Sequence, residues 1–483
     1  MKVRRSGALV ALVAMLAACG GDDGGSNGGT APPIGATPAP PPPPPSTTAG
    51  CSLRERQDWV NAQIRDWYLF PETLPASLSP AAYSTVDDFI DALTANARAQ
   101  RKDRYFTYLT SIAEENAYYS SGSDAGFGIR FAVDSGARRL FVIESFETGP
   151  GYAAGIRRGT EVLGIGTGAG SVQSVSSLWA SGGVDAVANA LGPDQAGVAR
   201  TLQLGGAGGD RTVSVTKANF ALQPLSSEYG AKIIQDGAKK VGYLNMRTFI
   251  DTADPQLRAA FADFKAQGVS ELIIDFRYNG GGIIDIAELM GDLLGANRQP
   301  TDVLSYTTYR PEKASRNETR YFQPKAQSIA PTKIAFIGTG STASASELVI
   351  NAMVPYLRGN VALVGTNTYG KPVGQIGLDR TQCDDRLRVV ALATQNADRR
   401  GDYYNGLATT VERTCQASDD ITRPLGDPQE ASVATALNFL AGRTCTPIGG
   451  SGGGISAQSV REVRETLTPA RPSTAQREVP GLF

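Results

Sequence analysis

The sequence contains no histidine among its 483 residues, and this absence excludes one class of catalytic site. A Ser-His-Asp triad uses an imidazole as its general base, so no such triad can be built from this chain. A serine nucleophile would need a different base, and lysine can act as one when it is deprotonated. The composition therefore directs the search toward a serine with a lysine partner.

An excess of either charge is also missing. Lysine and arginine number 46, aspartate and glutamate number 47, and the formal net charge is −1. Binding to nucleic-acid phosphates requires a basic face, so we expect no nucleic-acid partner. The sequence has no apparent cluster of metal ligands and no nucleotide-binding loop, and we expect neither a metal nor a cofactor.

Long apolar runs are scarce, and the one at residues 8–18 is too short to span a bilayer. It follows a basic start, as in an export signal, and ends in Leu16-Ala17-Ala18-Cys19, which resembles a bacterial lipobox. The resemblance implies a lipoprotein signal peptide over residues 1–18 and lipidation of Cys19. We expect a protein anchored to a membrane of the cell envelope and facing the periplasm, with Gly20 favouring the outer membrane. The alternative is an ordinary secretory signal with a chance cysteine.

Four further cysteines remain, and an even number in an oxidising compartment favours disulfides over free buried thiols. They are Cys51, Cys383, Cys415 and Cys445. Three pairings are possible, and the sequence does not choose among them. We prefer Cys383 with Cys415, which closes a local excursion, and Cys51 with Cys445, which joins the ends of the folded part.

Changes in composition suggest where the domains begin and end. Residues 19–50 are rich in glycine and proline and predict a disordered tether. Residues 51–120 show helical spacing of apolar residues, with helices expected over 53–68 and 86–99, and predict a small helical cap. Residues 446–483 are first rich in glycine and serine and then charged without apolar periodicity, which predicts a disordered tail.

Residues 121–219 form a stretch of strands punctuated by glycine. Gly126-Phe127-Gly128-Ile129 precedes one strand, and Ala153-Ala154-Gly155-Ile156 precedes another. This order resembles a PDZ domain of the bacterial type. The resemblance implies that a peptide adds as a strand to a sheet edge, with backbone N–H groups of Gly126, Phe127, Gly128 and Ile129 holding its C-terminal carboxylate. The alternative is that these glycines only shape a β-barrel.

Residues 220–445 have the pattern of an open α/β sheet. Apolar strands at 272–276, 334–337 and 361–364 are each short and continuous, as in strands buried on both faces. Amphipathic helices are expected between them, and functional loops should follow the carboxyl ends of the strands. One such loop leads into a helix that begins near Ser344 and should stop before Pro355.

Three sequence stretches in this region resemble the carboxyl-terminal processing (tail-specific) peptidases. They are Asp-Phe-Arg-Tyr-Asn-Gly-Gly-Gly at 275–282, Ser-Thr-Ala-Ser-Ala-Ser-Glu at 341–347 and Tyr-Gly-Lys-Pro-Val-Gly-Gln at 369–375. The resemblance covers residues 51 to 445. It implies a crotonase-like, ClpP-like α/β protease core with an inserted PDZ-like β-rich domain and an N-terminal helical cap. It also implies a lipoprotein-type serine endopeptidase that cuts near the exposed C-termini of extracytoplasmic proteins or peptides.

By position in the family pattern, Ser344 is the nucleophile, Lys371 the base and Gln375 the residue that orients the lysine. A lysine has a reference pKa of about 10.4 and becomes a base near neutrality only when burial away from countercharge lowers that pKa. No carboxylate is adjacent to Lys371 in the sequence, and a glutamine can accept its hydrogen bond without adding charge. The alternative for Lys371 is a solvated turn lysine.

The resemblance also places an oxyanion hole at the backbone N–H groups of Ala345 and Gly281. The glycines at 280–282 would equally suit a tight turn from strand to helix. Ser346 is a rival nucleophile, because spacing from the strand does not separate it from Ser344. The segment 354–360 is longer than in the best-known members, and we expect a surface turn to absorb it.

Two other functions compete with the peptidase. One is a catalytically inactive, PDZ-containing, peptide-binding lipoprotein, which the presence of Ser344, Lys371, Gln375 and the three glycines disfavours. The other is cleavage of small peptides or binding of hydrophobic ligands in the same α/β core.

Overall fold

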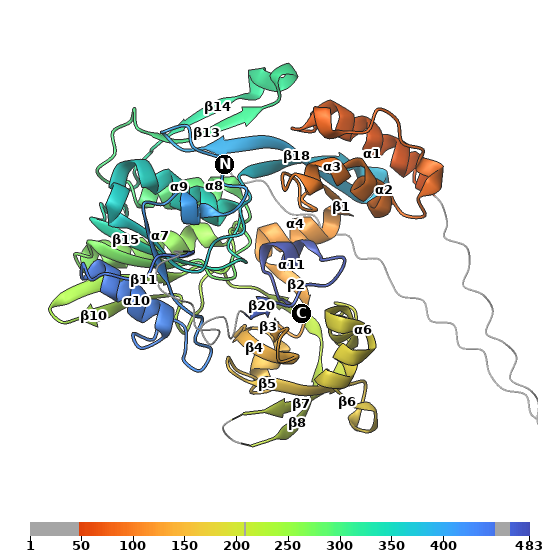
Figure 1. Ribbon diagram of the computed structural model, residues 1–483, viewed down its shortest axis with the longest axis horizontal. Coiled ribbons are helices and arrows are strands. Elements are labelled where there is room, and N and C mark those ends of the chain that lie inside the picture. The colour runs from red at the N-terminus through yellow and green to blue at the C-terminus, as the bar shows by residue number, and fades with distance from the viewer. Residues whose placement is uncertain (1–47, 207–208, 450–463) are drawn as a thin grey trace, which may run out of the picture. The chain divides into compact units, whose positions relative to one another are not determined.

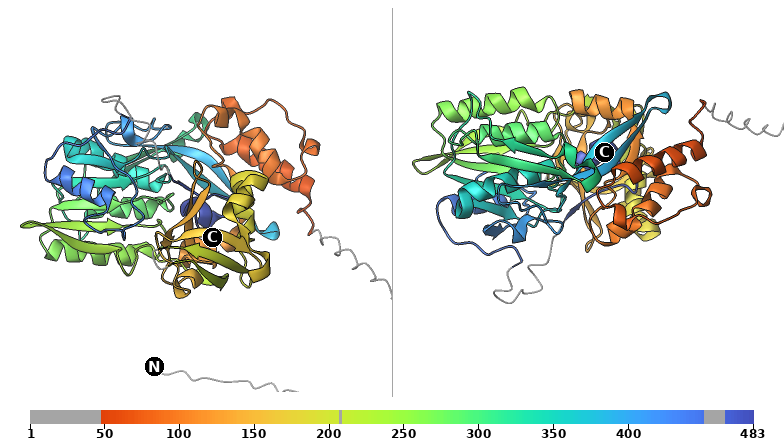
Figure 2. Two further views of the ribbon diagram at one scale, coloured as in Figure 1. Left: turned by 60° about the horizontal axis from the view of Figure 1, so that its bottom comes forward. Right: turned by 90° about the horizontal axis from the view of Figure 1, so that it is seen from above.

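The structure, a computed structural model, describes residues 48–206, 209–449 and 464–483. Residues 47–483 form one compact unit, whose described strands make four sheets (Figures 1 and 2). The predicted signal peptide, Cys19 and nearly all of the predicted tether lie outside the described residues. Within the described ranges, no helix combines the length and the apolar character needed to cross a bilayer.

The central sheet has six strands in the order β10-β11-β12-β15-β16-β19, all parallel except for the β10–β11 pair. The strands are β10 (Ala231–Asp236), β11 (Lys239–Asn245), β12 (Glu271–Asp275), β15 (Lys333–Gly338), β16 (Val361–Gly365) and β19 (Arg413–Gln416). The middle residues of β11, β12, β15 and β16 are buried on both faces and mostly apolar, as expected for strands covered by helices, whereas the edge strands β10 and β19 are more exposed. The predicted α/β core is confirmed.

Helices cover both faces of this sheet because successive strand residues point in opposite directions. Leu272 and Ile274 pack on one face with α7 (Ala253–Ala266), α8 (Ile284–Leu293) and α9 (Ala345–Leu357). Ile273 packs on the other face with α10 (Ala431–Leu440). Asp275 at the end of β12 pairs in register with Ile337 of β15, so the loops that follow these two strands emerge side by side.

A second sheet joins the N-terminal helical segment to the core. Its strands are β1 (Tyr108–Ser111), β18 (Asp385–Gln395), β13 (Val303–Tyr309), β14 (Glu318–Tyr321) and β17 (Val373–Arg380). The helices of the N-terminal segment are α1 (Leu53–Trp67), α2 (Val86–Leu93), α3 (Ala95–Ala99) and α4 (Ile112–Ser121). Apolar residues of α1 and α2 pack against β17 and β18. The single helix predicted over 86–99 is two helices, because the backbone at Thr94 leaves the helical region.

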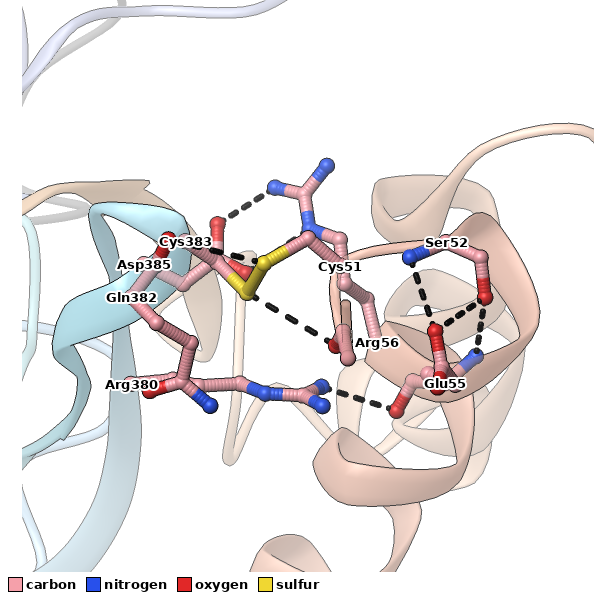
Figure 3. The surroundings of a disulfide bond; sticks show 9 residues. Cys51, Ser52, Glu55, Arg56, Arg380, Gln382, Cys383 and Asp385 are labelled. Atoms are coloured by element: carbon pink, nitrogen blue, oxygen red, sulfur yellow. Dashed lines mark hydrogen bonds and ion pairs between the residues drawn. A yellow bond between two sulfur atoms is a disulfide. The ribbon is translucent and has the colours of Figure 1, made fainter. Parts of the chain in front are cut away.

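Two disulfides are present, and the pairing that we preferred is wrong. Cys51 bonds to Cys383 and Cys415 bonds to Cys445, with Cα atoms 5.6 and 5.3 Å apart. The turn between β17 and β18 lies beside the start of α1, where Arg56 pairs with Asp385 (Figure 3). This long-range packing, which sequence separation does not reveal, brings Cys383 to Cys51.

The β-rich module, residues 121–219, has its own sheet and its own apolar core. The sheet contains β3 (Ile129–Asp134), β4 (Arg139–Ser145), β5 (Glu161–Gly166), β6 (Gln173–Ser174), β7 (Ala199–Gly205) and β8 (Arg211–Thr216). Helices α5 (Pro150–Ala153) and α6 (Val175–Ala190) accompany it. The antiparallel pair of β2 (Ser123–Gly126) and β9 (Ala218–Ala221) lies where the chain enters and leaves the module.

The prediction of a disordered tail is wrong for residues 464–483. They form β20 (Glu465–Thr466), which pairs with β3, and α11 (Thr474–Glu478), which lies beside α4 (Figure 1). Leu467, Val479, Leu482 and Phe483 are buried. These apolar side chains follow no helical or strand period, but each has a partner elsewhere in the fold. Residues 450–463 lie outside the described residues.

The helix that begins at Ala345 does not stop before Pro355, as the sequence had indicated, but continues to Leu357. A proline in a helix leaves the carbonyl four residues earlier without its donor. Here the carbonyl oxygen of Asn351 accepts a hydrogen bond from Asn396 Nδ2 instead (3.2 Å). A short 3-10 turn, η5 (Arg358–Asn360), follows at the surface and leads into β16.

Candidate active site

Ser344 lies at a sharp turn between β15 and α9. Its backbone angles are φ 53° and ψ −115°, a region that residues with a side chain rarely adopt. Strained backbone of this kind persists only when the surroundings hold it, and it clusters at functional sites. The turn places Ser344, partly buried, immediately before the first turn of α9.

Lys371 and Ser344 line the same cavity, which has a volume of about 360 Å³. The lysine comes from the loop between β16 and β17, and Gly282 lies on the wall of the same cavity. Among the described residues, the Ser344 hydroxyl and the Lys371 amine form no hydrogen bond with each other. The structure thus brings the predicted nucleophile and base into one cavity without joining them.

Gln375 holds the lysine by its uncharged amide. The Lys371 amine donates to Gln375 Oε1 (2.8 Å), and Gln375 Nε2 donates to the carbonyl oxygen of Phe106 (2.5 Å). The second bond fixes the amide oxygen toward the lysine. Burial lowers the pKa of Lys371, and the carboxylate of Glu478 opposes this shift. Within the described ranges, no carboxylate lies within ion-pair distance of the Lys371 amine.

Ser346, the rival nucleophile, has a different environment. Its side chain is fully buried and its hydroxyl donates to the carbonyl oxygen of Asn279 (3.2 Å). Ser346 does not line the cavity that contains Ser344 and Lys371. The geometry therefore favours Ser344 over Ser346.

The loop of three glycines lies directly against the Ser344 turn. A Cβ atom at Gly281 would lie 2.8 Å from Ser344 Cβ and 3.1 Å from the amide nitrogen of Ala345, so only glycine fits. However, the Gly281 N–H donates to Asn279 Oδ1 (2.9 Å), and the Gly280 N–H donates to the carbonyl oxygen of Glu478 (2.9 Å). The Gly281 amide that we expected to face an oxyanion is thus engaged within its own loop.

Glu347 connects the Ser344 turn with the Lys371 loop, and we assigned it no role from the sequence. Its buried carboxylate accepts from the N–H groups of Ser344 (3.1 Å), Gly370 (2.8 Å) and Lys371 (2.7 Å) and from Thr368 Oγ1 (2.6 Å). Burial raises the pKa of Glu347 to about 7, although these four hydrogen bonds oppose the shift. The Ser-x-x-Glu spacing of a helix capping box was the signal that could have revealed it.

Three of the four residues predicted to bind a peptide terminus in the β-rich module lie against Phe483 of the same chain, and the fourth, Gly128, lies against Gly149. The N–H groups of Phe127 and Ile129 donate to the carbonyl oxygen of Phe483 (2.9 and 3.3 Å). A Cβ atom at Gly126 would lie 2.8 Å from the carbonyl carbon of Phe483. Gly128 has a positive φ of 63° and packs against Gly149.

The sequence matches two family models. One describes peptidase family S41 and matches residues 240–402, and the other describes the peptidase S41 N-terminal domain and matches residues 55–108. In these two regions the chain is similar to peptidase family S41. Ser344, Lys371 and Gln375 all lie inside the first match, and the β-rich module lies between the two matches.

Two curated relatives show the extent of the similarity. The chloroplastic C-terminal processing peptidase of Tetradesmus obliquus is 27% identical over 282 residues, which is 54% of each chain. The chloroplastic carboxyl-terminal-processing peptidase 3 of Arabidopsis thaliana is 27% identical over 342 residues, 68% of this chain and 61% of the relative. The chain thus spans somewhat more than half the length of these relatives.

One solved structure shows the same fold. It is a crystal structure of a protein from Bacteroides fragilis assigned to the S41 proteases. The TM-score is 0.60 at 22% sequence identity, and the similarity covers 80% of this chain and 97% of the other chain. This similarity extends beyond the two regions matched by the family models.

Proposed function

We propose that this chain is a serine endopeptidase in which Ser344 is the nucleophile and Lys371 the general base. The observation that carries the proposal is the shared cavity, in which the Lys371 amine is held by the uncharged oxygen of Gln375. A lysine buried beside an amide rather than a carboxylate has its pKa lowered toward the range in which it can take a proton.

In the reaction we propose, neutral Lys371 takes the hydroxyl proton of Ser344 as Oγ attacks the carbonyl carbon of the peptide bond. The N–H of Ala345, at the start of α9, has no acceptor within the helix and is placed to bind the developing oxyanion. For the glycine loop to supply a second donor, the Gly281 N–H must first break its hydrogen bond to Asn279 Oδ1. Lys371 then gives its proton to the leaving amine, and water hydrolyses the acyl-enzyme.

We propose that the substrates are proteins with exposed C-termini and that the β-rich module is a PDZ-like domain that captures those termini. Support comes from the start of β3, where the N–H groups of Phe127 and Ile129 donate to the carbonyl oxygen of a residue in an added strand. The names of the two chloroplastic relatives, which describe C-terminal processing, favour the same substrate class.

We further propose that the protein works outside the cytoplasm, anchored by a lipid at Cys19. The two disulfides support an oxidising compartment. Incorporation of a labelled fatty acid into the full chain, compared with a Cys19→Ala variant, tests the anchor. Equal labelling of both proteins would exclude lipidation at Cys19.

The test of the dyad uses the compact unit of residues 47–483 and an unfolded reporter protein. Ser344→Ala and Lys371→Ala should each abolish cleavage, while Ser346→Ala, the matched control, should retain most of it because its hydroxyl faces Asn279. Melting curves should show that all three variants fold. Full cleavage by Ser344→Ala or by Lys371→Ala would refute the dyad.

A further inference from the structure

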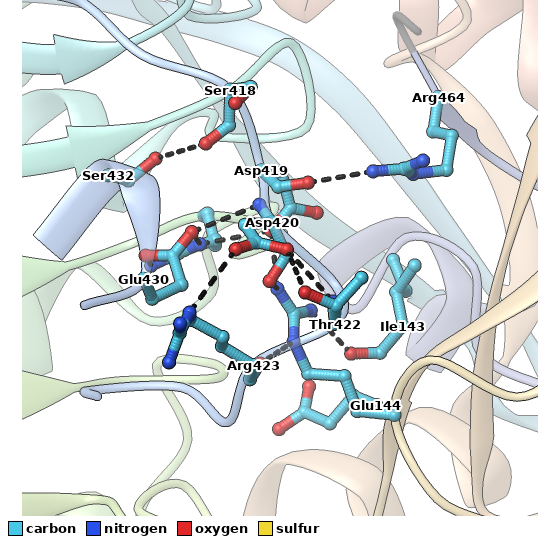
Figure 4. Close-up of polar contacts among 12 residues, drawn as sticks. Ile143, Glu144, Ser418, Asp419, Asp420, Thr422, Arg423, Glu430, Ser432 and Arg464 are labelled. Carbon is cyan, nitrogen blue, oxygen red and sulfur yellow. Dashed lines mark hydrogen bonds and ion pairs between the residues drawn. The ribbon is translucent and has the colours of Figure 1, made fainter. Parts of the chain in front are cut away.

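Residues 464–483, which we call the tail segment, contact both the β-rich module and the catalytic cavity. Arg464 Nη2 at its start donates to the carbonyl oxygen of Asp419 (2.8 Å; Figure 4). The segment then passes through β20 and α11 and ends at Phe483 against β3. No other described segment touches both the predicted peptide-binding edge and the glycine loop of the catalytic site through backbone hydrogen bonds in this way.

At the module, the last residues of the sequence lie as an added strand. The Phe483 N–H donates to the Ile129 carbonyl (3.0 Å), and the Phe131 N–H donates to the Gly481 carbonyl (2.8 Å). The Phe483 ring is buried, with its centroid 6.0 Å from that of Phe131. The Lys217 amine lies 5.9 Å from the Phe483 ring centroid. These contacts are those of a ligand strand with its final side chain in a pocket.

A polar clamp fixes the tail segment one turn upstream of this strand. Gln476 Nε2 donates to Asp194 Oδ2 (2.6 Å) and also to the carbonyl oxygen of Leu482 (2.9 Å). Asp194 in turn pairs with the buried Lys217 amine (2.5 Å). The module therefore forms hydrogen bonds with the backbone of the tail segment and also with the Gln476 side chain.

Near Ser344 and Lys371, Glu478 of the tail segment lies against the glycine loop, and Arg477 precedes it in α11. The carbonyl oxygen of Glu478 accepts from the Gly280 N–H (2.9 Å), and Glu478 lines the cavity that contains Ser344 and Lys371. Arg477 Nη1 donates to the carbonyl oxygen of Tyr105 (2.9 Å).

The Glu478 carboxylate is buried and only half satisfied. Oε1 accepts from the Tyr119 hydroxyl (3.1 Å), whereas Oε2 has no hydrogen-bond partner among the described residues. The carboxylate raises the pKa of Lys371 against the effect of burial, which favours the protonated, unreactive amine. Occupation of the site by the segment and protonation of Lys371 would both reduce activity.

We propose that the tail segment is an intramolecular ligand of this site, bound in place of a substrate. Residues 481–483 take the position of the substrate's terminal strand in the module, and residues 477–478 take the position of its backbone at the glycine loop. Substrates must displace the segment, and those that present large apolar side chains to the module, as Leu482 and Phe483 do, compete best. This inference rests on the proposed peptidase function for its kinetic consequence but not for its binding consequence.

The binding test is independent of catalysis. A fluorescent peptide with the sequence of residues 474–483 is titrated into the unit of residues 47–483, a Phe483→Asp variant and a chain that ends at residue 473. The two altered proteins should bind the peptide at least about tenfold more tightly than the parent, because a tethered ligand competes at about millimolar effective concentration. Equal affinity for all three proteins would overturn the proposal, and so would peptide binding to none of them. A peptide of scrambled order is the control for non-specific binding.

The kinetic test compares cleavage of the unfolded reporter, with intact mass confirming each tail. Phe483→Asp should lower KM by about tenfold with little change in kcat, and the added peptide should raise KM again. Thr468→Ala, an exposed change in the same segment, should change neither constant. A folded Phe483→Asp variant with lower kcat would show that the segment is part of the catalytic structure and would overturn the proposal. If no protein cleaves the reporter, the peptidase function fails, while the peptide titration still decides the inference.

Discussion

Two buried clusters of charged residues in this molecule are built in opposite ways. In the first, the guanidinium of Arg277 is fully buried and donates to three carboxylates, those of Asp275, Asp419 and Glu430, at 2.8–3.0 Å. Figure 4 shows Asp419 and Glu430 among their polar contacts. In the second, the Lys371 amine has one neutral acceptor, Gln375, and no carboxylate at ion-pair distance among the described residues.

The difference distinguishes a cluster that stabilises the fold, around Arg277, from one that suits proton transfer, around Lys371. A buried charge with all of its donors satisfied keeps its protonation state and fixes the positions of neighbouring strands and loops. A buried charge without a countercharge is easily neutralised, which is what a general base requires. Arg277 follows β12 and Lys371 precedes β17, so the same fold supplies both environments.

Replacing the under-compensated lysine should give the largest effect on activity and little effect on stability. Lys371→Met removes the base, so cleavage of an unfolded reporter should fall by about 10⁴-fold or more. Its free energy of unfolding in urea should stay equal or rise, because a poorly compensated buried cation is lost. Lys239→Met, at an exposed ion pair, is the control for both measurements. A large loss of stability in Lys371→Met would remove the contrast between the clusters.

Replacing the fully compensated arginine should do the reverse. Arg277→Met leaves the buried carboxylates of Asp275 and Glu430, and the partly buried one of Asp419, without their common partner and should lower the free energy of unfolding by about 3–5 kcal/mol. Urea denaturation measures this, and Arg54→Ala, at an exposed pair within α1, should show no measurable change. A near-neutral Arg277→Met would mean that the network does not hold the fold.

Adding a charge beside Lys371 should make the catalytic cluster resemble the arginine cluster. Gln375→Glu places a carboxylate next to the amine and should raise the pKa of Lys371 by about one unit or more. Activity requires the neutral amine, so the acid limb of the kcat/KM profile should move to higher pH, with recovery in alkaline buffer. Gln375→Ala, which adds no charge, should lower the rate without an alkaline shift. An unmoved limb in Gln375→Glu would argue against Lys371 as the base.

The smallest expected effect is on stability and concerns Glu347, whose carboxylate accepts hydrogen bonds from both the Ser344 turn and the Lys371 loop. Because burial raises its pKa to about 7, the folded state holds a proton that the unfolded state releases near the ordinary value of 4.5. The resulting stability is complete below the ordinary pKa and is lost as the pH rises through about 7. The difference in unfolding free energy between the parent and Glu347→Gln should therefore shrink or change sign from pH 5 to pH 8. A difference that does not vary with pH would contradict the assigned shift.

Sequence patterns predicted the core well because its strands are buried on both faces and read as short continuous apolar runs. The same patterns located the loops of Ser344 and Lys371, which the structure brings to one cavity. Their catalytic roles, and that of Gln375, remain predictions until the variants are measured.

What the sequence did not reveal depends on contacts between distant parts of the chain. The pairing of Cys51 with Cys383 follows from the packing of α1 beside the β17–β18 turn. Residues 464–483 are ordered because single apolar side chains pack against surfaces from other parts of the chain. These side chains follow no helical or strand period, so the sequence pattern does not predict an ordered segment. Glu347 was visible as a capping residue, but its bonds to Gly370 and Lys371 required the fold.

The most direct test of the central claim is the rate at which a serine-reactive fluorophosphonate labels Ser344 as a function of pH, with the labelled residue identified by mass spectrometry. The account predicts labelling at Ser344, at a rate that rises with pH through an apparent pKa below the ordinary lysine value and that is nearly absent in Lys371→Met. Labelling of Ser346, or labelling of Ser344 at the same rate and with the same pH dependence in Lys371→Met, would contradict it.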